Sequence, residues 1–263
     1  RDHAANRRKA PIMTDPILMH EADGVLELRF NRPDKKNAIL GGMYDTLTAA
    51  LDRAAASAGI RAVLIGAEGD VFTAGNDIRD FLAMAGGLQD APPARFIRAI
   101  AGFGKPLVAA VQGPAVGVGT TLLLHCDLVY ASPAATFSAP FVNLGLVPEA
   151  GSSLLLPARM GHARAATLLL LGDSIDAEAA MQAGLLSGIV PADALQAHAR
   201  EKARQLARQP PAALAASRAL MRGDPAALHA RMRQEEAAFS HALASPEARA
   251  AFAAFLDRPS RAS

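Results

Sequence analysis

The chain has 263 residues, of which 51% are hydrophobic and 5% are aromatic, and it contains no tryptophan. Its 27 basic and 25 acidic residues give a formal net charge of +2, and the basic clusters do not alternate with aromatic residues, which argues against a nucleic-acid-binding protein. No apolar run reaches about 18 residues, so the sequence predicts no membrane-spanning helix.

The single cysteine and the first residues bear on where the protein works. Cys126 has no partner for an intramolecular disulfide, which favours a reducing, cytoplasmic compartment. The first residues are polar and basic and contain no apolar signal core. We therefore expect residues 1–13 to be a disordered lead-in, with Met13 as a candidate natural start.

Short apolar runs alternate with helical patterns from the start of the chain. An alternating run predicts a strand over residues 25–30, which Pro33 ends because proline fixes φ and lacks an amide donor. An amphipathic helix is predicted over 43–56 and a buried strand over 62–65, followed by a short segment over 72–75 that ends at a turn. This order of elements indicates an α/β protein.

The same alternation continues after a stretch that is rich in glycine and proline. Residues 84–93 predict a mobile connection. A helix is then expected over 94–103, a buried strand over 107–111, a helix over 119–125 and a strand over 128–130.

The last third of the chain is dominated by helical patterns. From Ser152 onward we expect helices, apart from a short strand over 188–190. Asp224 and Ser245 each precede a proline, which predicts two helix starts with a capping oxygen and a proline at the first helical position. We divide the chain into a core over 14–205 and a C-terminal helical region over 206–263.

Several common site motifs are absent or incomplete in the sequence. Gly117 and Gly119 resemble the start of a dinucleotide fingerprint, but Leu122 stands where the third glycine belongs. Neither a phosphate-binding loop nor a Gly-x-Ser-x-Gly elbow occurs, so Ser152 and Ser153 are interpreted as helix-start residues. The histidines have no metal-binding spacing, and we expect no metal; His125 and His162 are interpreted as packing or surface residues.

Two segments share a pattern that suits binding of an oxyanion. Residues 72–78 and 113–119 each run from a buried strand through small residues into a helix. Such a turn leaves backbone N–H groups unpaired, and two converging turns can stabilise a developing negative charge without a charged side chain. Two ordinary strand-to-helix turns explain the pattern equally well.

Four motifs in order resemble the crotonase, or enoyl-CoA hydratase/isomerase, family. They cover residues 31–39 (NRPDKKNAI), 72–78 (FTAGNDI), 113–127 (GPAVGVGTTLLLHCD) and 137–151 (FSAPFVNLGLVPEAG), and the resemblance extends from about residue 16 to residue 258. It implies a spiral of ββα units followed by C-terminal helices that form a homotrimer, or a hexamer built as a dimer of trimers. It also implies an acyl-CoA thioester as substrate and no cofactor beyond its coenzyme A moiety. With such a substrate, we expect the stretch from Phe81 to Pro93 to line the acyl tunnel.

The resemblance assigns roles to particular residues. The backbone amides of Asn76 and Val118 correspond to the two donors that hold the thioester oxygen. The family's coenzyme A contacts fall on six positions: Lys35, Lys36, Ala38, Ala74, Asp77 and Ile78. The two lysines attract phosphate if they do not simply belong to a solvated loop, and Asp77 can instead cap the following helix.

The catalytic carboxylate is the most specific expectation. Family hydratases use two glutamates, but the matching positions here are Thr121 and Phe141. Glu149 stands at a predicted helix start, as in the Δ3,Δ2-enoyl-CoA isomerase branch, in an apolar setting that includes Phe141 and Leu144 as substrate contacts. A single carboxylate can move a proton from C2 to C4 of a 3-enoyl thioester. Without the resemblance, Glu149 reads as a first-turn glutamate that complements the helix dipole.

Three functions follow from these residues. The first is isomerisation of a 3-enoyl-CoA to a 2-enoyl-CoA by Glu149. The second is hydration or another crotonase-family acyl-CoA reaction that uses Glu149 with a different partner. The third is an acyl-CoA-binding protein without catalytic activity.

Overall fold

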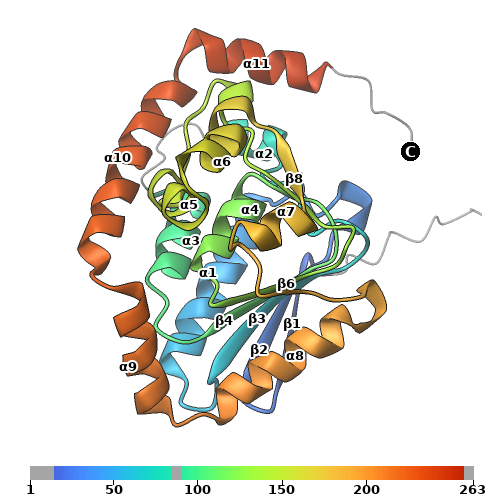
Figure 1. Cartoon of the computed structure of the whole chain (residues 1–263). Helices are drawn as coiled ribbons and strands as arrows, with labels where there is room; N and C mark the ends of the chain where they lie inside the picture. Colours follow the sequence, from blue (N-terminus) through green and yellow to red (C-terminus); the bar gives the residue numbers. More distant parts are fainter. Residues whose placement is uncertain (1–14, 84–89, 258–263) are drawn as a thin grey trace, which may run out of the picture.

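A six-stranded sheet organises the computed structural model, which describes residues 15–83 and 90–257 (Figure 1). Its strands, in spatial order, are β1 (Ile17–Ala22), β2 (Val25–Phe30), β3 (Ala62–Ala67), β4 (Leu107–Val111), β6 (Leu128–Ala131) and β9 (Gly188–Ile189). Strands β1 and β2 are antiparallel, and every later neighbour is parallel. The predicted lead-in over 1–13 lies outside the described residues.

A smaller sheet of three strands lies beside the first. It consists of β5 (Ala115–Val116), β7 (Thr136–Ser138) and β8 (Ser174–Asp176), paired in that order. The chain passes from the large sheet to the small one twice, from β4 to β5 and from β6 to β7, and a helix follows each pair. This repetition of two strands and a helix confirms the expected ββα spiral.

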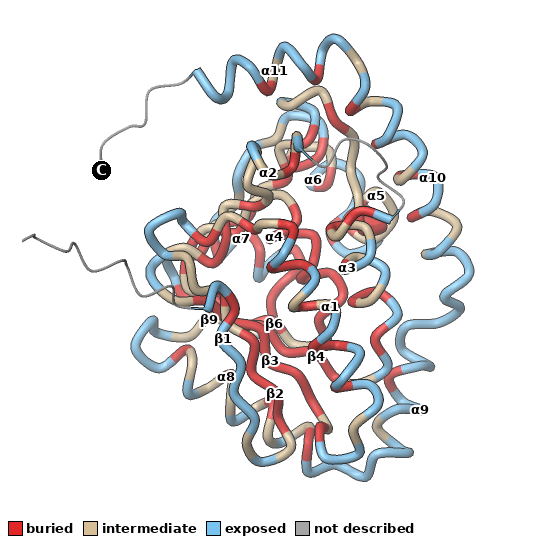
Figure 2. The backbone as a smooth tube through the Cα atoms, turned by 180° about the vertical axis from the view of Figure 1, so that it is seen from behind, coloured by how far each residue is buried: buried red, intermediate tan, exposed pale blue. Residues whose placement is uncertain are grey.

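The helices of the core occupy both faces of the large sheet. They are α1 (Gly41–Ala56), α2 (Ile78–Ala83), α3 (Pro92–Ala101), α4 (Val118–Thr121), α5 (Ser152–Met160), α6 (His162–Ala166), α7 (Ala177–Gln182) and α8 (Ala192–Arg208). Only α8 among them packs on the lower face in Figure 1, while the others lie above the sheet. The inner strands β2, β3 and β4 are buried almost throughout, as Figure 2 shows, whereas the edge strand β1 buries only Ile17.

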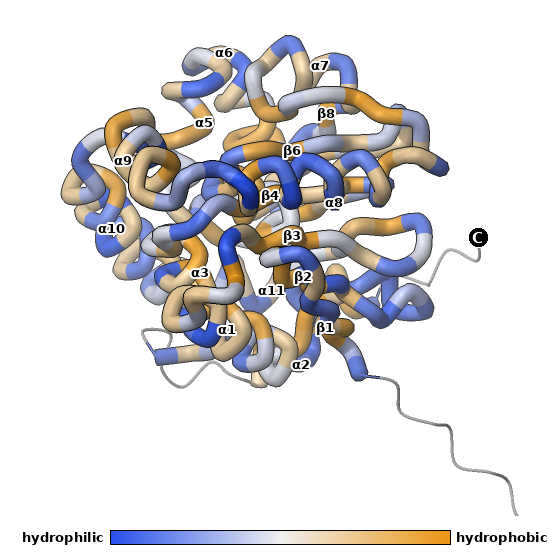
Figure 3. Tube along the Cα trace, turned by 90° about the horizontal axis from the view of Figure 1, so that it is seen from below, coloured by the Kyte–Doolittle hydropathy of each residue, from blue (hydrophilic) through white to orange (hydrophobic). Residues whose placement is uncertain are grey.

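Alternating side chains of each strand supply the two layers. In β3, Val63 and Ile65 join the main core, whereas Leu64 faces α8. Side chains of successive strand residues point to opposite faces, so a strand covered on both sides must be apolar in every position. Helix α8 is mostly hydrophilic (Figure 3) but buries Leu195 and a row of alanines spaced four apart, which lets it approach the sheet closely.

The structure adds strands that the sequence analysis missed and redraws one helix. Strands β1, β5, β7 and β8 were not predicted, and β8 interrupts the expected helical third. The helix predicted over 119–125 is a single α-turn, α4, followed by a 3₁₀ helix, η3 (Leu122–His125). Strands β5, β7 and β8 have only two or three residues and carry no periodic signal. Strand β1 has six residues, but its burial does not alternate, since only Ile17 is buried.

Three further helices, α9 (Pro211–Arg222), α10 (Pro225–Leu243) and α11 (Pro246–Leu256), complete the described chain. The predicted caps are confirmed, because the side chains of Asp224 and Ser245 accept hydrogen bonds from the amides of Ala226 and Ala248. Helix α10 runs along the flank of the core and α11 crosses its upper end (Figure 1). The predicted boundary after residue 205 falls within the last turn of α8.

Side chains of α9 attach this region to the end of η3. The Arg218 guanidinium is paired with Asp127, with Nε 2.8 Å from each carboxylate oxygen, and it also donates to the carbonyl of Phe103 at 2.7 Å. Arg222 donates to the carbonyl of His125. Across residues 15–83 and 90–257, no helix is both long and apolar enough to cross a membrane.

Candidate active site

The two small-residue turns identified in the sequence lie against each other. The amide of Val116 donates to the carbonyl of Thr73 at 3.0 Å, and Thr73 and Ala115 form a parallel bridge. Gly75 has a φ of +86°, and a Cβ atom there would lie 2.9 Å from the carbonyl oxygen of Val116. Glycine is therefore required at this position, both for its backbone angle and for the close approach of the two segments.

Each turn presents one free amide. The amide of Ile39 donates to Gly75 O at 2.8 Å and that of Asp77 donates to Ile39 O at 2.9 Å, which turns the amide of Asn76 to the opposite side. Val118 begins α4 after Gly117, whose φ of 58° and ψ of −119° suit only glycine. Within the described ranges, neither the Asn76 nor the Val118 amide donates a hydrogen bond, so both are available to an oxyanion.

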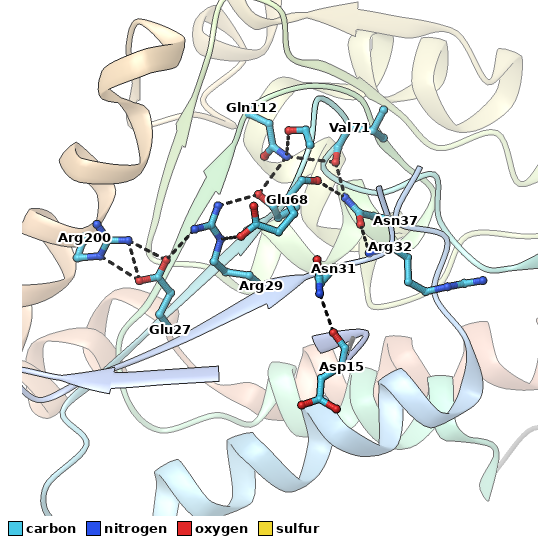
Figure 4. A network of polar contacts seen from close by, with 12 residues as sticks. Asp15, Glu27, Arg29, Asn31, Arg32, Asn37, Glu68, Val71, Gln112 and Arg200 are labelled. Atoms are coloured by element: carbon cyan, nitrogen blue, oxygen red, sulfur yellow. Dashed lines mark hydrogen bonds and ion pairs between the residues drawn. The ribbon is translucent and has the colours of Figure 1, made fainter. Parts of the chain in front are cut away.

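The loop of the first motif is fixed beside these turns by a buried asparagine. The Asn37 side chain donates to the carbonyls of Glu68 and Val71 at 2.8 and 2.7 Å and accepts from the amide of Arg32 at 2.8 Å (Figure 4). Arg32 in turn donates to the carbonyl of Ala38 at 2.6 Å. These hydrogen bonds restrain the loop, and its residues Arg32, Lys35 and Ala38 line a cavity.

The ion pairs drawn in Figure 4 brace the same side of the sheet. Glu27, which is buried in β2, accepts two hydrogen bonds of 3.0 Å from Arg200 of α8, and Arg29 lies 3.1 Å from Glu68. This network connects the sheet to α8 and, through Glu68, to the turn that Asn37 contacts.

One cavity of about 1020 Å³ collects nearly all of the predicted site residues. Those that line it are Lys35, Ala38, Ala74, Asn76, Asp77, Ile78, Val118, Phe141, Leu144 and Glu149. Lys36 does not line the cavity: its side chain is exposed, its φ is +51°, and its carbonyl accepts from the Ala74 amide. Phe81 and Pro93 line the cavity as expected, and part of the predicted mobile connection lies outside the described residues.

The basic side chains of the cavity wall and the apolar residues of the C-terminal helices come from different elements. Arg32, Lys35 and Arg79 come from the first motif and the start of α2. The C-terminal helices contribute apolar residues, among them Met232, Phe239, Phe252, Phe255 and Leu256. The cavity therefore joins a cationic region, suited to phosphate, to an apolar region suited to a hydrocarbon chain.

Glu149 lies in the turn that precedes α5. The alternative interpretation of Glu149 as a first-turn glutamate that complements the helix dipole is therefore wrong, because it required a position inside the first turn of the helix. Helix α5 begins at Ser152 with Gly151 as its N-cap residue, and it has no acidic residue in its first turn. One carboxylate oxygen, Oε1, accepts a hydrogen bond from the Thr121 hydroxyl. The other oxygen, Oε2, is buried and has no hydrogen-bond partner in the described part of the chain.

The surroundings of Glu149 favour its protonated form. Burial raises the pKa of its carboxyl from the ordinary value of 4.5 to about 8, the hydrogen bond from Thr121 lowers it, and the negative charge of Glu235 raises it. A group that ionises near neutral pH can both accept and return a proton. Thr121 is fully buried behind Glu149, and Phe141 forms cavity wall, so the two positions that match hydratase glutamates hold no second carboxylate.

The fold brings three further residues to this site, of which Tyr44 and Glu235 were missed by the sequence analysis. The Tyr44 hydroxyl of α1 donates to the Asn76 side-chain oxygen at 2.5 Å, and burial, then the charge of Glu149, raise the pKa of this hydroxyl well above its ordinary value. His125 is a buried packing residue, as expected, but its Nε2 also lies 2.9 Å from the carbonyl of Ala150. Glu235 of α10 binds the start of α5.

No metal site accompanies these groups in the described residues, where no three histidine, cysteine or acidic side chains cluster suitably. The arrangement consists of two free amides, one buried carboxylate with an unpaired oxygen, and a cavity with cationic and apolar parts. Such a site can stabilise an enolate and move a proton at a neighbouring carbon.

Comparisons with known proteins agree with this reading. The family model described as "Enoyl-CoA hydratase/isomerase" matches residues 20–261. Enoyl-CoA delta isomerase 2 of Rattus norvegicus is 39% identical over 78% of the chain, and the match covers 54% of that protein, so the chain spans about half of the length of this relative. The 2,3-dehydroadipyl-CoA hydratase of Escherichia coli is 35% identical over 92% of the chain and 96% of its own length.

A solved structure shows the same fold. The enoyl-CoA hydratase/isomerase from Pseudoalteromonas atlantica superposes with a TM-score of 0.87 at 43% identity, covering 94% of this chain and all of the other. The relatives thus include both isomerases and hydratases, so their names alone do not separate the two reactions.

Proposed function

The chain belongs to the enoyl-CoA hydratase/isomerase family, and from this premise we propose that it is an enoyl-CoA isomerase that converts a 3-enoyl-CoA to the 2-enoyl-CoA. The observation that carries the proposal is that, among the described residues, the site has one buried carboxylate, Glu149, with an unpaired oxygen. Glu149 has one free, buried oxygen at the cavity, while the two positions that match hydratase glutamates hold Thr121 and Phe141.

In the proposed reaction, the thioester oxygen binds the free amides of Asn76 and Val118. Their donation stabilises the enolate and so acidifies the proton at C2 of the substrate. Glu149 accepts this proton through Oε2, and the electron pair of the C–H bond spreads over the thioester oxygen, C2 and C4. The protonated Glu149 then returns the same proton to C4, which leaves the double bond between C2 and C3.

The hydrogen bonding of Glu149 suits this transfer. The hydrogen bond from Thr121 to Oε1 restrains the carboxylate and leaves Oε2 as its unpaired oxygen. A carboxylate with a pKa near 8 is a stronger base than an exposed glutamate, and it still returns its proton readily. No activated water is needed, because the same proton leaves C2 and arrives at C4.

The wall of the cavity supports a substrate with an apolar acyl chain. Lys35 and Arg32 suit the phosphates of coenzyme A, whereas Phe81, Phe239 and Phe252 pack together on the apolar side, with ring centroids of Phe81 6.2 and 6.4 Å from those of the other two. We propose a linear hydrocarbon chain as the acyl group, and no cofactor besides the coenzyme A of the substrate.

Hydration is the second candidate, because a hydratase of Escherichia coli aligns with almost the whole chain. It requires a group that activates water beside the one that handles the α proton. Glu235 also lines the cavity, but both of its oxygens already accept hydrogen bonds from the start of α5. Because both oxygens of Glu235 are engaged, Glu149 is the one of these two glutamates that has an unpaired oxygen. This difference favours isomerisation over hydration.

The test is the ultraviolet absorbance of the conjugated thioester, measured with 3-enoyl-CoA and 2-enoyl-CoA substrates of several chain lengths. We expect absorbance to rise from the 3-enoyl substrates and to stay constant with the 2-enoyl substrates. Loss of absorbance from 2-enoyl-CoA identifies a hydratase instead. Binding of acyl-CoA in calorimetry, with neither change in absorbance, contradicts isomerisation and supports the acyl-CoA-binding alternative.

The assembly remains a proposal that rests on the family resemblance. We propose a homotrimer or a dimer of trimers, with α9 at a contact between copies because Leu220 and Met221 of this helix are 84% and 87% exposed. Light scattering of the purified protein measures the mass of the assembly directly, and a monomer contradicts the proposal.

A further inference from the structure

A buried carboxylate of the C-terminal region reaches the loop that carries Glu149. Glu235 lies in α10 and is 6% exposed. Its Oε2 accepts a hydrogen bond from the Gly151 amide at 2.6 Å, and its Oε1 accepts from the amide and the hydroxyl of Ser153 at 3.0 and 2.5 Å. Arg231, one turn earlier in α10, donates to the same hydroxyl at 3.3 Å.

These bonds replace a cap that α5 lacks in its own sequence. The N-cap residue is Gly151, which has no side chain, and the first turn contains no acidic residue. The unpaired amides at the start of a helix attract a negative charge. Glu235 supplies that charge from a helix more than 80 positions later in the chain, so docking of α10 completes the start of α5.

The bonds also act on a short segment with unusual backbone angles. Ala150 and Gly151 have φ values of +59° and +72°, and they are the two residues between Glu149 and α5. A left-handed conformation at a residue other than glycine costs free energy and persists where the surroundings hold it. Here the holding contacts are His125 on the carbonyl of Ala150 and Glu235 on the amide of Gly151.

The charge of Glu235 reaches Glu149 as well. It opposes ionisation of Glu149, and so contributes to the raised pKa of that carboxyl after the larger effect of burial. Tyr44 of α1 and Thr121 of α4 are the other groups that interact with Glu149, and buried His125 is held neutral by a pKa of about 4. The other charged residues of the cavity wall are Arg32, Lys35, Asp77, Arg79 and Glu236.

We propose that Glu235 is a positioning residue for the proton transfer at Glu149, because it ties α10 to the catalytic loop and keeps a fixed negative charge beside it. The proposal rests on the proposed function for its kinetic consequences. It assigns the C-terminal helices a part in setting the base, in addition to the apolar wall that they give to the cavity.

Two variants separate the charge of Glu235 from the length of its side chain. Glu235→Gln removes the charge and turns an amide group towards the donors of α5. We expect the plateau of kcat/KM for 3-enoyl-CoA to fall by about ten- to a hundredfold, and the midpoint of its pH profile to move to lower pH because Glu149 then ionises more easily. Glu235→Asp keeps the charge but shortens the side chain, so the plateau falls while the midpoint stays close to that of the wild type.

The matched control is Glu247→Gln, which removes the same charge from an exposed position in the first turn of α11. We expect both the plateau and the midpoint to match the wild type. Thermal unfolding verifies that each variant is folded. If Glu235→Gln does not fold, Ser153→Ala tests the same contact from the other side, because it removes the 2.5 Å bond and leaves the charge in place.

Two measurements decide the proposal independently of turnover. Carboxyl carbon NMR, assigned with Glu149→Gln, follows the titration of Glu149, and amide hydrogen exchange follows Gly151 and Ser153. We expect Glu235→Gln to lower the titration midpoint and to accelerate exchange at both amides, and Ser153→Ala to accelerate exchange at residue 153. Unchanged titration and exchange overturn the proposal even in an active isomerase. A wild type that does not isomerise 3-enoyl-CoA overturns the proposed function instead, and the two measurements still decide the role of Glu235.

Discussion

The two small-residue turns (residues 72–78 and 113–119) and the loop of Glu149 (residues 149–151) contribute to the wall of one cavity. The turns and the loop are built in different ways. The turns depend on backbone groups: Gly75 and Gly117 adopt positive φ, and the two segments bond directly to each other. The loop depends on side chains that come from three other elements, namely Thr121 of α4, His125 of η3 and Glu235 of α10.

This difference determines how each region responds to change. A turn made of backbone tolerates a new side chain wherever the backbone angles and the close approaches are preserved. The Glu149 loop responds to the loss of one distant atom, because burial makes each hydrogen bond to a carboxylate worth more than in water. Substitutions in the two regions therefore test different parts of the same site.

The largest effect is expected from Glu149→Gln, which removes the proton acceptor and keeps the shape of the side chain. Isomerisation of 3-enoyl-CoA should fall by about a thousand- to ten-thousandfold, while the affinity for acyl-CoA measured by calorimetry stays close to that of the wild type. Activity near the wild-type rate would show that another group carries the proton, and that the Glu149 loop does not supply the base.

On the other side, Gly75→Ala should disrupt the oxyanion turns. The added Cβ meets the carbonyl of Val116 at 2.9 Å, so the two segments must separate and the Asn76 amide loses its position. We expect kcat to fall by about a hundred- to a thousandfold. The control is Gly42→Ala in α1, where a Cβ has no neighbour within 4 Å and activity should be retained. Equal activity of the two variants argues against the turn as the oxyanion site.

The pH profile of the wild type sharpens the account of the loop. Glu149 accepts a proton only when it is ionised, and its pKa is raised to about 8, so the competent fraction increases as the pH rises through that value. Between pH 6 and pH 9, kcat/KM should increase by about a hundredfold and then level off. A profile that is already flat from pH 6 would mean that the carboxylate is ionised there, as an exposed glutamate is.

A smaller effect is expected from Thr121→Val, which conserves shape and removes the hydroxyl that donates to Glu149. This bond lowers the pKa of Glu149, so its loss should move the pH profile to higher pH and reduce the rate at pH 7 by about tenfold. Thr46→Val is the control, since in the described part of the chain the Thr46 hydroxyl donates only to the carbonyl of Gly42, one turn earlier in α1. A shift to lower pH would contradict the role of Thr121.

The parts of the site that were predicted are those with local signatures. Glycine beside small residues after an apolar strand predicted both turns, and the capping residues Asp224 and Ser245 predicted two helices that the structure confirms. Short strands such as β5 and β8 carry no periodic pattern and were missed. Lys36 was assigned together with Lys35 from the family resemblance, but in the structure it has a left-handed backbone and does not line the cavity.

By itself, the sequence determined the alternation of strands and helices, the resemblance to one family and the choice of Glu149 as the candidate base. These conclusions depend on periodicity, on glycine and on motifs, all of which act within short stretches of chain. Only the tertiary structure decided what surrounds that base: Glu235 at the start of α5, His125 at the carbonyl of Ala150, and Tyr44 beside Asn76. The physical reason is that burial and charge depend on distance in space, and α10 lies beside the loop only in the folded chain, since Glu235 is 84 positions away from Gly151 in sequence.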